Sequence, residues 1–266
     1  MKFLKKIFRL AAISWGDTMQ YRADISMWIL AEAATPLVSM VLWYTVAKNS
    51  DQGFSPQETL NYYILTILVM TATDSWAGFY LAQEILNGTI VQRLIKPIAV
   101  FWDLIINNAV GKVFRFLIPL PLFIVSLWLF PTFFVSTLYQ WRPWFLFMVS
   151  LFLALCLAFF IDVIFGLFAF WLEDAVNIRW FKDTLKMITS GIIIPIAIMP
   201  TSVQHIVNLL PFRHIITTPT EIILGRISGT SLLYALGIQL AWVVSTGIIV
   251  VVMWKRGLKR YAPPGQ

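Results

Sequence analysis

The sequence is poor in the residues that carry most enzyme chemistry. It contains one cysteine, Cys156, and two histidines, His205 and His214. A single cysteine forms neither an internal disulfide nor a Cys-x-x-Cys site, and the two histidines lie in a proline-broken segment without the spacing of a metal pair. The sequence also lacks the GxxxxGK[ST], HExxH and GxSxG motifs. We therefore expect a non-catalytic chain that holds no cofactor of its own and hydrolyses no nucleotide.

Charge is scarce as well. Only 12% of the 266 residues are charged, 59% are hydrophobic, and the mean hydropathy is +0.78. Soluble domains are about a quarter charged, and each Å² of apolar surface left in water costs roughly 25 cal/mol. Lipid is the simplest environment for so much apolar surface, so the composition predicts an integral membrane protein.

The apolar runs predict an all-α membrane protein with one transmembrane domain over residues 1–266. A helix crosses the hydrocarbon core in about 20 residues. The fifth run is too short for a simple crossing, and four prolines interrupt the chain from this run to the start of the last one. Because irregular backbone inside a membrane needs cover from protein or water, we expect a re-entrant external cap over 201–230. A plain crossing with a long outer loop is the alternative. The six predicted spans are 27–47, 59–81, 113–131, 144–172, 187–200 and 231–254.

The positive charges predict the orientation. The net charge is +7, which we assign to short loops rather than to a nucleic-acid partner. With six spans, 16 of the 20 Lys and Arg residues fall on the side of the two termini, in 1–22, 82–115, 173–186 and the C-terminal tail. The positive-inside rule then makes both termini cytosolic. Residues 1–22 have one basic and one apolar face, which predicts an interfacial helix on the membrane surface; a frayed cytosolic tail is the alternative.

Three acidic residues, Glu32, Asp74 and Asp162, lie inside predicted spans. Charges there are costly, so they are usually paired or face a wet cavity. Lys112 and Arg115 mark the inner end of the third span, near the inner halves of the first two. We expect Glu32 or Asp74 to pair with one of these cations and to gate a translocation path; structural pairing without a role in transport is the alternative. Asp162 has no obvious partner in this chain, and a partner subunit could supply one.

The segment 83–97 has the pattern of a short amphipathic helix on the cytosolic side. Gly88 permits a bend, and Pro97 ends the helix. Such a helix suits docking into a groove of a cytosolic partner, while an ordinary interfacial connector is the alternative. The residues expected at this contact are Glu84, Ile85, Gly88, Val91, Arg93, Leu94, Lys96 and Pro97.

Several short residue patterns occur, each once and in a definite order, along nearly the whole chain. They are the basic arm before Tyr21-Arg22, Trp43 followed by Gly53-Phe54-Ser55 and Tyr62-Tyr63, the 83–97 segment, Leu210-Pro211-Phe212 with Pro219 and Gly225, and Gly257 with Arg260 and Tyr261. In their order and spacing these patterns resemble the six-span permease subunits of bacterial type 2 ABC exporters.

The resemblance implies a mode of action that composition does not show. Such permeases pair with a second permease, identical or related, above two copies of a separate ATP-binding subunit, which binds the ATP and magnesium. The segment 83–97 matches the family's coupling helix, 1–22 its interfacial helix, and 201–230 its re-entrant external helices. The implied function is ATP-driven export of an amphipathic lipid, glycan, peptide or drug across the bacterial cytoplasmic membrane. A membrane channel or a lipid-modifying enzyme is the alternative.

Overall fold

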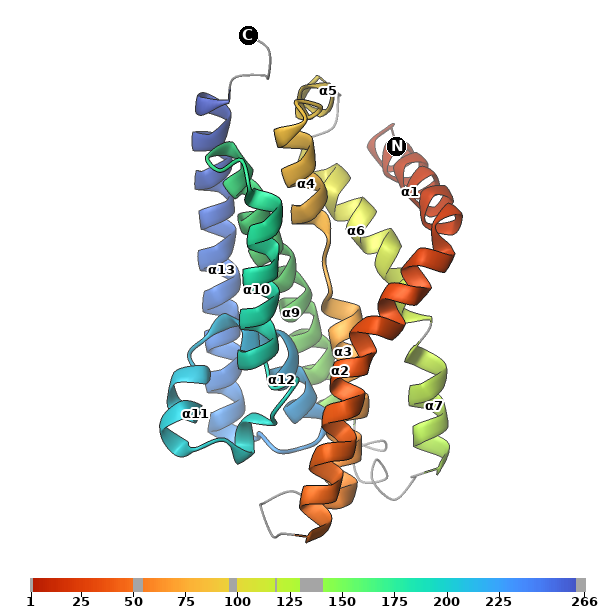
Figure 1. The fold of residues 1–266 in the computed structure, drawn as a ribbon, viewed down its shortest axis with the longest axis vertical. Helices are drawn as coiled ribbons and strands as arrows, with labels where there is room; N and C mark the ends of the chain where they lie inside the picture. The colour runs from red at the N-terminus through yellow and green to blue at the C-terminus, as the bar shows by residue number, and fades with distance from the viewer. Residues whose placement is uncertain (1, 50–54, 96–99, 118, 130–140, 262–266) are drawn as a thin grey trace.

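The computed structural model describes residues 2–49, 55–95, 100–117, 119–129 and 141–261. Within these ranges the chain forms helices and no strands (Figure 1). The α-helices are α1 (Lys2–Gln20), α2 (Arg22–Asn49), α3 (Pro56–Thr73), α4 (Ala77–Leu86), α5 (Ile90–Leu94), α6 (Val100–Phe116), α7 (Pro119–Leu129), α9 (Trp141–Leu167), α10 (Ala175–Thr189), α11 (Thr201–Val207), α12 (Pro211–Ile223) and α13 (Gly229–Arg260). Two 3₁₀ helices are η1 (Phe168–Phe170) and η2 (Ile196–Ile198).

Four helical segments in the described part of the chain are long and apolar enough to cross a membrane. They are α2, α3 together with α4, α9 together with η1, and α13. A fifth crossing can be made by α6 and α7, whose axes are bent by 46° relative to each other. The all-α membrane class is therefore confirmed, with four to five candidate spans, and the sixth span stays a prediction.

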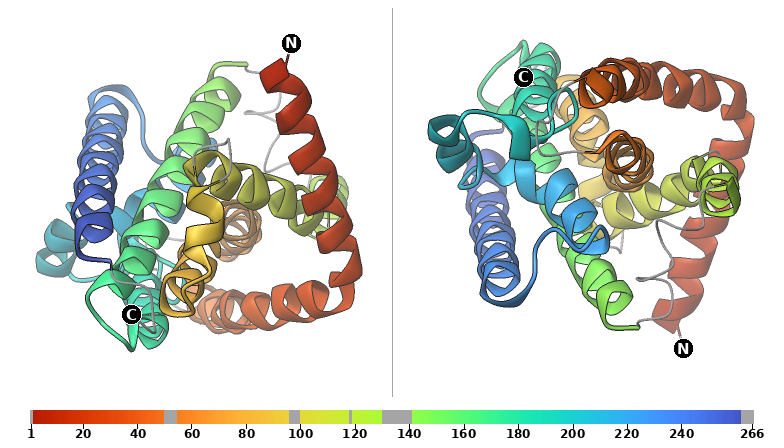
Figure 2. Two further views of the ribbon diagram at one scale, coloured as in Figure 1. Left: turned by 90° about the horizontal axis from the view of Figure 1, so that it is seen from above. Right: turned by 90° about the horizontal axis from the view of Figure 1, so that it is seen from below.

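The helices run mainly along one axis of the molecule. The start of α1, the end of α13 and α5 lie towards one end, whereas α11 and the start of α3 lie towards the other (Figure 1). Helix α1 is seen lengthwise when the molecule is viewed down that axis, so it lies across the bundle rather than along it (Figure 2). It packs against α6.

Helix α3 forms the centre of the bundle. It begins with a capping box, in which the Ser55 hydroxyl accepts from the Glu58 amide while the Glu58 carboxylate accepts from the Ser55 amide. Nearly all of its residues are buried, and it contacts α2, α6, α7, α9 and α12. A helix that is apolar on every face is stable only where protein or lipid surrounds it completely.

The predicted second span is not one continuous helix. It stops at Thr73 and resumes at Ala77 as α4. The break lies inside the bundle, and the polar groups that make it possible come from α6, α9 and α10, far away in the sequence. Hydropathy alone therefore gave the length of this segment but not its interruption.

Two predictions for residues 173–200 were wrong. The expected polar loop 173–186 is mostly helix α10, and the expected helical span 187–200 holds only the end of α10, an irregular stretch and η2. The physical reason is that the charges of α10 are satisfied by protein. Lys182 is buried and ion-paired with Asp162, so a helix with this many charges can pack against α9.

The irregular stretch after α10 is held by side-chain donors. The carbonyl of Ser190 accepts from the Thr217 hydroxyl at 2.6 Å, and that of Gly191 from the Tyr62 hydroxyl at 2.9 Å. Two more donors, the Trp43 indole N–H at 2.8 Å and the Tyr63 hydroxyl at 2.9 Å, converge on the carbonyl of Ile193. Buried backbone groups need such partners when no helix provides them. Trp43, Tyr62 and Tyr63, noted above only as part of a pattern, thus stabilise this segment.

Changing Tyr62 to phenylalanine is expected to destabilise the chain by about 1–3 kcal/mol, because the Gly191 carbonyl is left buried without its donor. Thermal unfolding of the purified protein in detergent measures the effect. Tyr80→Phe is the matched control, since the Tyr80 side chain is largely exposed. Equal stabilities for the two variants would contradict this role for Tyr62.

The predicted external segment 201–230 divides into two parts. The short α11 is largely exposed, whereas α12 is buried and packs against α9 and α3. His214 in α12 is fully buried, with its ring nitrogens 3.0 Å from the Thr218 hydroxyl and from the Asn208 carbonyl. These contacts make it a structural histidine, and the exposed His205 on α11 is not brought to it.

Candidate functional site

At the break between α3 and α4, charged side chains from other helices contact both helix ends. The Lys112 ammonium of α6 donates to the Thr73 carbonyl, at the end of α3, with an N–O distance of 3.3 Å. The Asp162 carboxylate of α9 accepts from the Gly78 amide at 2.8 Å and from the Ser75 hydroxyl at 3.1 Å, at the start of α4. A cation at a helix C-terminus and an anion at an N-terminus both match the helix dipole. They also satisfy backbone groups that α3 and α4 leave free.

The helices α4 and α9 touch at two glycines. A Cβ added to Gly78 would collide with the backbone of Asp162, and one added to Gly166 would collide with the backbone of Gly78. Small residues let helix backbones approach this closely in membranes. The contact brings the Asp162 side chain within hydrogen-bond distance of the start of α4.

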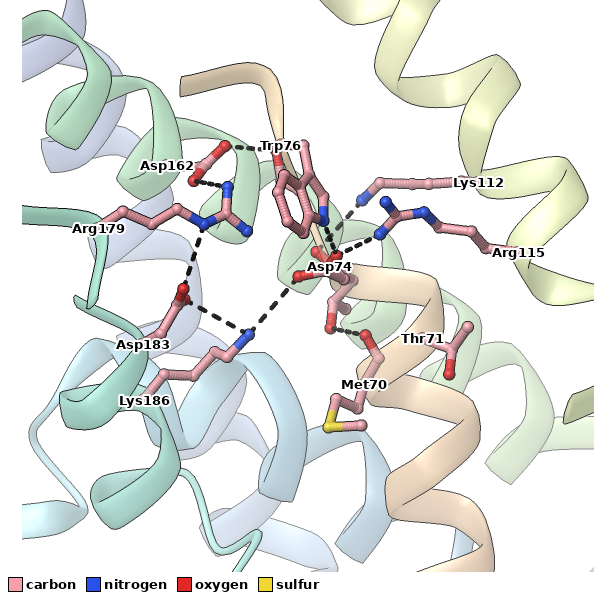
Figure 3. A network of polar contacts seen from close by, with 12 residues as sticks. Met70, Thr71, Asp74, Trp76, Lys112, Arg115, Asp162, Arg179, Asp183 and Lys186 are labelled. Carbon is pink, nitrogen blue, oxygen red and sulfur yellow. Dashed lines mark hydrogen bonds and ion pairs between the residues drawn. The ribbon is translucent and has the colours of Figure 1, made fainter. Parts of the chain in front are cut away.

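Asp74 lies at the break and is buried. It forms ion pairs with Arg115 of α6 and, at 3.7 Å, with Lys186 of α10, and it accepts from the Trp76 indole N–H at 2.8 Å (Figure 3). The expected pairing of Asp74 with Arg115 is confirmed.

Asp162 is only 3% exposed and is paired within the chain. Its carboxylate lies 2.5 Å from the Lys182 ammonium and 3.9 Å from the Arg179 guanidinium, both on α10. The expectation that Asp162 lacks a partner in this chain was therefore wrong. It failed because 173–186 was predicted to be a loop in water, whereas α10 packs directly against α9.

A third carboxylate, Asp183, connects the ion pairs around Asp74 with those around Asp162. It is 3.2 Å from Arg179, 3.4 Å from Lys182 and 3.9 Å from Lys186. The Arg179 guanidinium also lies over the Trp76 ring, 3.8 Å from its centroid, a favourable cation–π geometry. We call the connected side chains the charge network. Its members are Asp74, Lys112, Arg115, Asp162, Arg179, Lys182, Asp183 and Lys186. Figure 3 labels all of them except Lys182.

Four members of the charge network were not predicted as site residues, namely Arg179, Lys182, Asp183 and Lys186. They occupy positions i, i+3, i+4 and i+7, which lie on one face of a helix. That spacing was the available signal, and it was hidden by the prediction of a loop.

The network also changes the basis of the predicted orientation. Five of the cations counted in short cytosolic loops are members of it: Lys112, Arg115, Arg179, Lys182 and Lys186. Buried, paired cations do not report on loop charge. The terminal segments and Arg93 still place an excess of positive charge at the end that holds α5.

A cavity of about 440 Å³ lies beside the network, between α2, the α3–α4 break and α10. Asp74, Asp183, Arg179 and Lys186 contribute to its wall, together with Glu32 of α2. Unlike the other four, Glu32 has no ion pair or hydrogen bond with its side chain among the described residues. The structure thus brings Glu32 close to the network but not into the pairing with Lys112 or Arg115 that was an alternative for it.

The predicted coupling segment is not a single helix over 83–97. Helix α4 continues to Leu86, the chain turns at Asn87–Thr89, and α5 contains 5 residues. Gly88 has a φ of 75°, in the left-handed region that glycine adopts without strain. Lys96 and Pro97 lie outside the described residues.

The turn is held by an arginine. Arg93 on α5 forms ion pairs with Glu84 of α4 at 2.7 Å and with Asp103 of α6 at 3.1 Å. Ile85 and Ile90 are buried beneath the turn, while Val91, Leu94 and Ile95 are exposed at its surface. The segment therefore presents an apolar tip, made of these three exposed residues, on a firmly attached base.

Long apolar helices around a network of ion pairs define an integral membrane protein. A family model described as ABC-2 family transporter protein matches residues 30–265. The chain belongs to this family and is a transmembrane permease of an ABC transporter, of about 260 residues. The resemblance drawn from the sequence is confirmed at this level, and the family implies an ATP-binding partner. No curated protein matches the chain.

Proposed function

We propose that the chain is the permease subunit of a bacterial ABC exporter for an amphipathic substrate. It crosses the cytoplasmic membrane six times, with α10 and the irregular stretch after it forming the partial fifth crossing and 201–230 forming a re-entrant external segment. Both termini and α5 are then cytosolic, and α1 lies in the membrane interface. A second permease, identical or related, completes the export path. Two copies of an ATP-binding subunit, which hold the ATP and magnesium, dock at the α5 end.

The observation that carries the proposal is the apolar tip of α5. Val91, Leu94 and Ile95 are exposed, and α5 lies at one end of the bundle (Figure 1), where a docking partner can reach it. Exposed apolar side chains clustered at one end typically mark an interaction site, and a short helix seated in a groove is a common recognition mode. The tip is attached through Arg93, Ile85 and Ile90, so a force on it acts on α4.

Helix α4 connects the tip to the charge network. It is 10 residues long and begins at the break, where Asp162 holds its first turn. A displacement of α5 by the ATP-binding subunits therefore shifts α4 against α9 at the Gly78–Gly166 contact. Because α3 is separated from α4 by the break, the shift is absorbed at Asp74 to Trp76, as in hinge motions of packed helices.

The charge network is the candidate gate. In this proposal Asp74, Lys112, Arg115 and Asp162 close the cytosolic half of the path, and Glu32 faces it from α2. Movement at the break changes which cations reach Asp74. Ion pairs that exchange partners in this way give two discrete arrangements, which a conformational switch requires.

Replacing Leu94 with aspartate is expected to reduce substrate-stimulated ATP hydrolysis by the assembled transporter at least about tenfold, since a charge in an apolar contact costs more than about 1.4 kcal/mol. The measurement is ATPase activity of the complex reconstituted in liposomes. Val203→Asp on α11 is the matched control, because Leu94 and Val203 are both 41% exposed but lie at opposite ends of the molecule.

Two outcomes would contradict the proposal. One is that Leu94→Asp leaves both complex assembly and coupled hydrolysis unchanged. The other is that no ATP-binding subunit co-purifies with the chain when it is isolated from its native membrane. The second result would favour the channel or the lipid-modifying enzyme as alternatives.

A further inference from the structure

The contacts of Arg93 extend beyond α4. Its guanidinium lies between two carboxylates, 2.7 Å from that of Glu84 on α4 and 3.1 Å from that of Asp103 on α6. The three side chains are only 16%, 22% and 15% exposed, and ion pairs shielded from water cost more to break than the weak pairs of an open surface. The planar guanidinium suits such a double contact. Arg93 therefore connects the short helix α5 to two longer helices at once.

Asp103 gives α5 a second point of attachment to α6. The chain itself joins the end of α5 to the start of α6, but a single joint lets one helix rotate relative to the other. Asp103 lies three residues after Val100, almost one turn inside α6. The side-chain amide of Asn107 contacts its carboxylate at 3.4 Å. Two points of attachment resist rotation, so a displacement of α5 moves α6 as a whole.

The other end of α6 reaches the charge network. Lys112 and Arg115 follow Asp103 by 9 and 12 residues in this continuous helix, which is about 14 and 18 Å along its axis. Lys112 donates to the Thr73 carbonyl at the end of α3, and Arg115 pairs with Asp74. Helix α4 begins on the other side of the same break. Figure 1 shows α4 and α6 both extending from the α5 end towards the middle of the bundle.

We propose that Arg93 is a positioning residue that makes α4 and α6 move together when α5 is displaced. The displacement then arrives on both sides of the α3–α4 break at once, which an attachment to α4 alone would not achieve. Arg115 moves with α6, and Asp74 keeps Lys186 of α10 as a second cation, 3.7 Å away. The buried carboxylate is thus paired in both arrangements, which avoids the cost of an isolated charge in a membrane. This inference rests on the proposed function, because it describes how the ATP-binding subunits act on the charge network.

The experiment follows α6 and α4 separately by distance measurements between spin labels. One label is placed at Ile105→Cys on α6 or at Gln83→Cys on α4, and the other at Lys255→Cys on α13, all at exposed positions. The only native cysteine is removed by Cys156→Ala. The labelled full chain is combined with its ATP-binding subunit in liposomes, and the distances are compared without nucleotide and with ATP and vanadate. Both distances are expected to change by about 2 Å, the size of a helix shift in a conformational switch.

Asp103→Asn removes the attachment to α6 and leaves that to Glu84 in place. The α6 distance is then expected to lose its response to nucleotide, whereas the α4 distance keeps it. The charge swap Arg93→Asp with Asp103→Arg still places one cation among two carboxylates, so it is expected to restore the α6 response. Asp174→Asn, which changes an exposed carboxylate, is the matched control and leaves both responses unchanged.

Three results would overturn the inference. They are an α6 response that survives Asp103→Asn, a charge swap that does not restore the response although the complex hydrolyses ATP, and a native chain in which neither distance responds. If one of these is found while Leu94→Asp still uncouples ATP hydrolysis, Arg93 loses this role and the permease function stands. If Leu94→Asp leaves coupling unchanged, the proposed function fails and the inference fails with it.

Discussion

Asparagine in place of Asp162 is expected to destabilise the chain by about 3 kcal/mol. The substitution leaves the buried Lys182 ammonium without its nearest carboxylate, 2.5 Å away in the native protein, and weakens the capping of α4 at Gly78. The effect lies at the lower end of the range for a broken buried pair because Asp183, 3.4 Å from Lys182, still faces the cation. No exposed carboxylate of the chain should matter as much.

The measurement is chemical or thermal unfolding of the purified protein in detergent, combined with a double-mutant cycle. Asp162→Asn with Lys182→Met should be more stable than Asp162→Asn alone, since the unpaired cation is gone. Asp174→Asn serves as the control, because Asp174 is exposed at the start of α10 and bonds only locally to Asn177. If Asp162→Asn were as stable as Asp174→Asn, Asp162 would not be the anchor described here.

Alanine in place of Gly78 is expected to cost about 1–3 kcal/mol, because the new methyl group collides with the Asp162 backbone and forces α4 away from α9. The same change at an unobstructed helical glycine stabilises by about 0.5–1 kcal/mol. Gly237 in α13 is such a position, since nothing lies within 4 Å of an added Cβ. Opposite signs are thus expected for two chemically identical substitutions.

Both variants are compared with the native protein by thermal unfolding in one detergent. Gly166→Ala provides a second test of the contact from its other side, since its methyl group would meet the Gly78 backbone. Destabilisation by Gly78→Ala and Gly166→Ala together with a neutral or stabilising Gly237→Ala would support the close crossing. A Gly78→Ala variant that matches Gly237→Ala would disprove it.

The long apolar helices were predictable because lipid imposes a simple length rule. The predicted spans 27–47, 144–172 and 231–254 correspond to α2, α9 with η1, and α13. Each is close to a continuous apolar run, so local composition and helix geometry agree. The bend at Gly88 was also predictable, since a left-handed φ favours glycine wherever it occurs.

The charge network could be predicted only in part. Glu32 or Asp74 was expected to pair with Lys112 or Arg115, and the pair that forms is Asp74 with Arg115. Arg179, Lys182 and Lys186 were assigned to water, since a hydropathy scale gives every charge the same cost whether or not it has a partner. Once Asp162 lies 2.5 Å from Lys182, that cost is largely cancelled, and α10 can pack with its charged face against α9.

The sequence by itself determined that this protein lives in a membrane, that it is built from helices, and which family it belongs to. These properties follow from composition and from local order along the chain. Only the tertiary structure decided that the second span is broken, that residues 175–189 form a helix packed against α9 and that Asp162 has a partner. The reason is that a charge inside a membrane is tolerated only through contacts with residues distant in sequence, and such contacts exist only after folding.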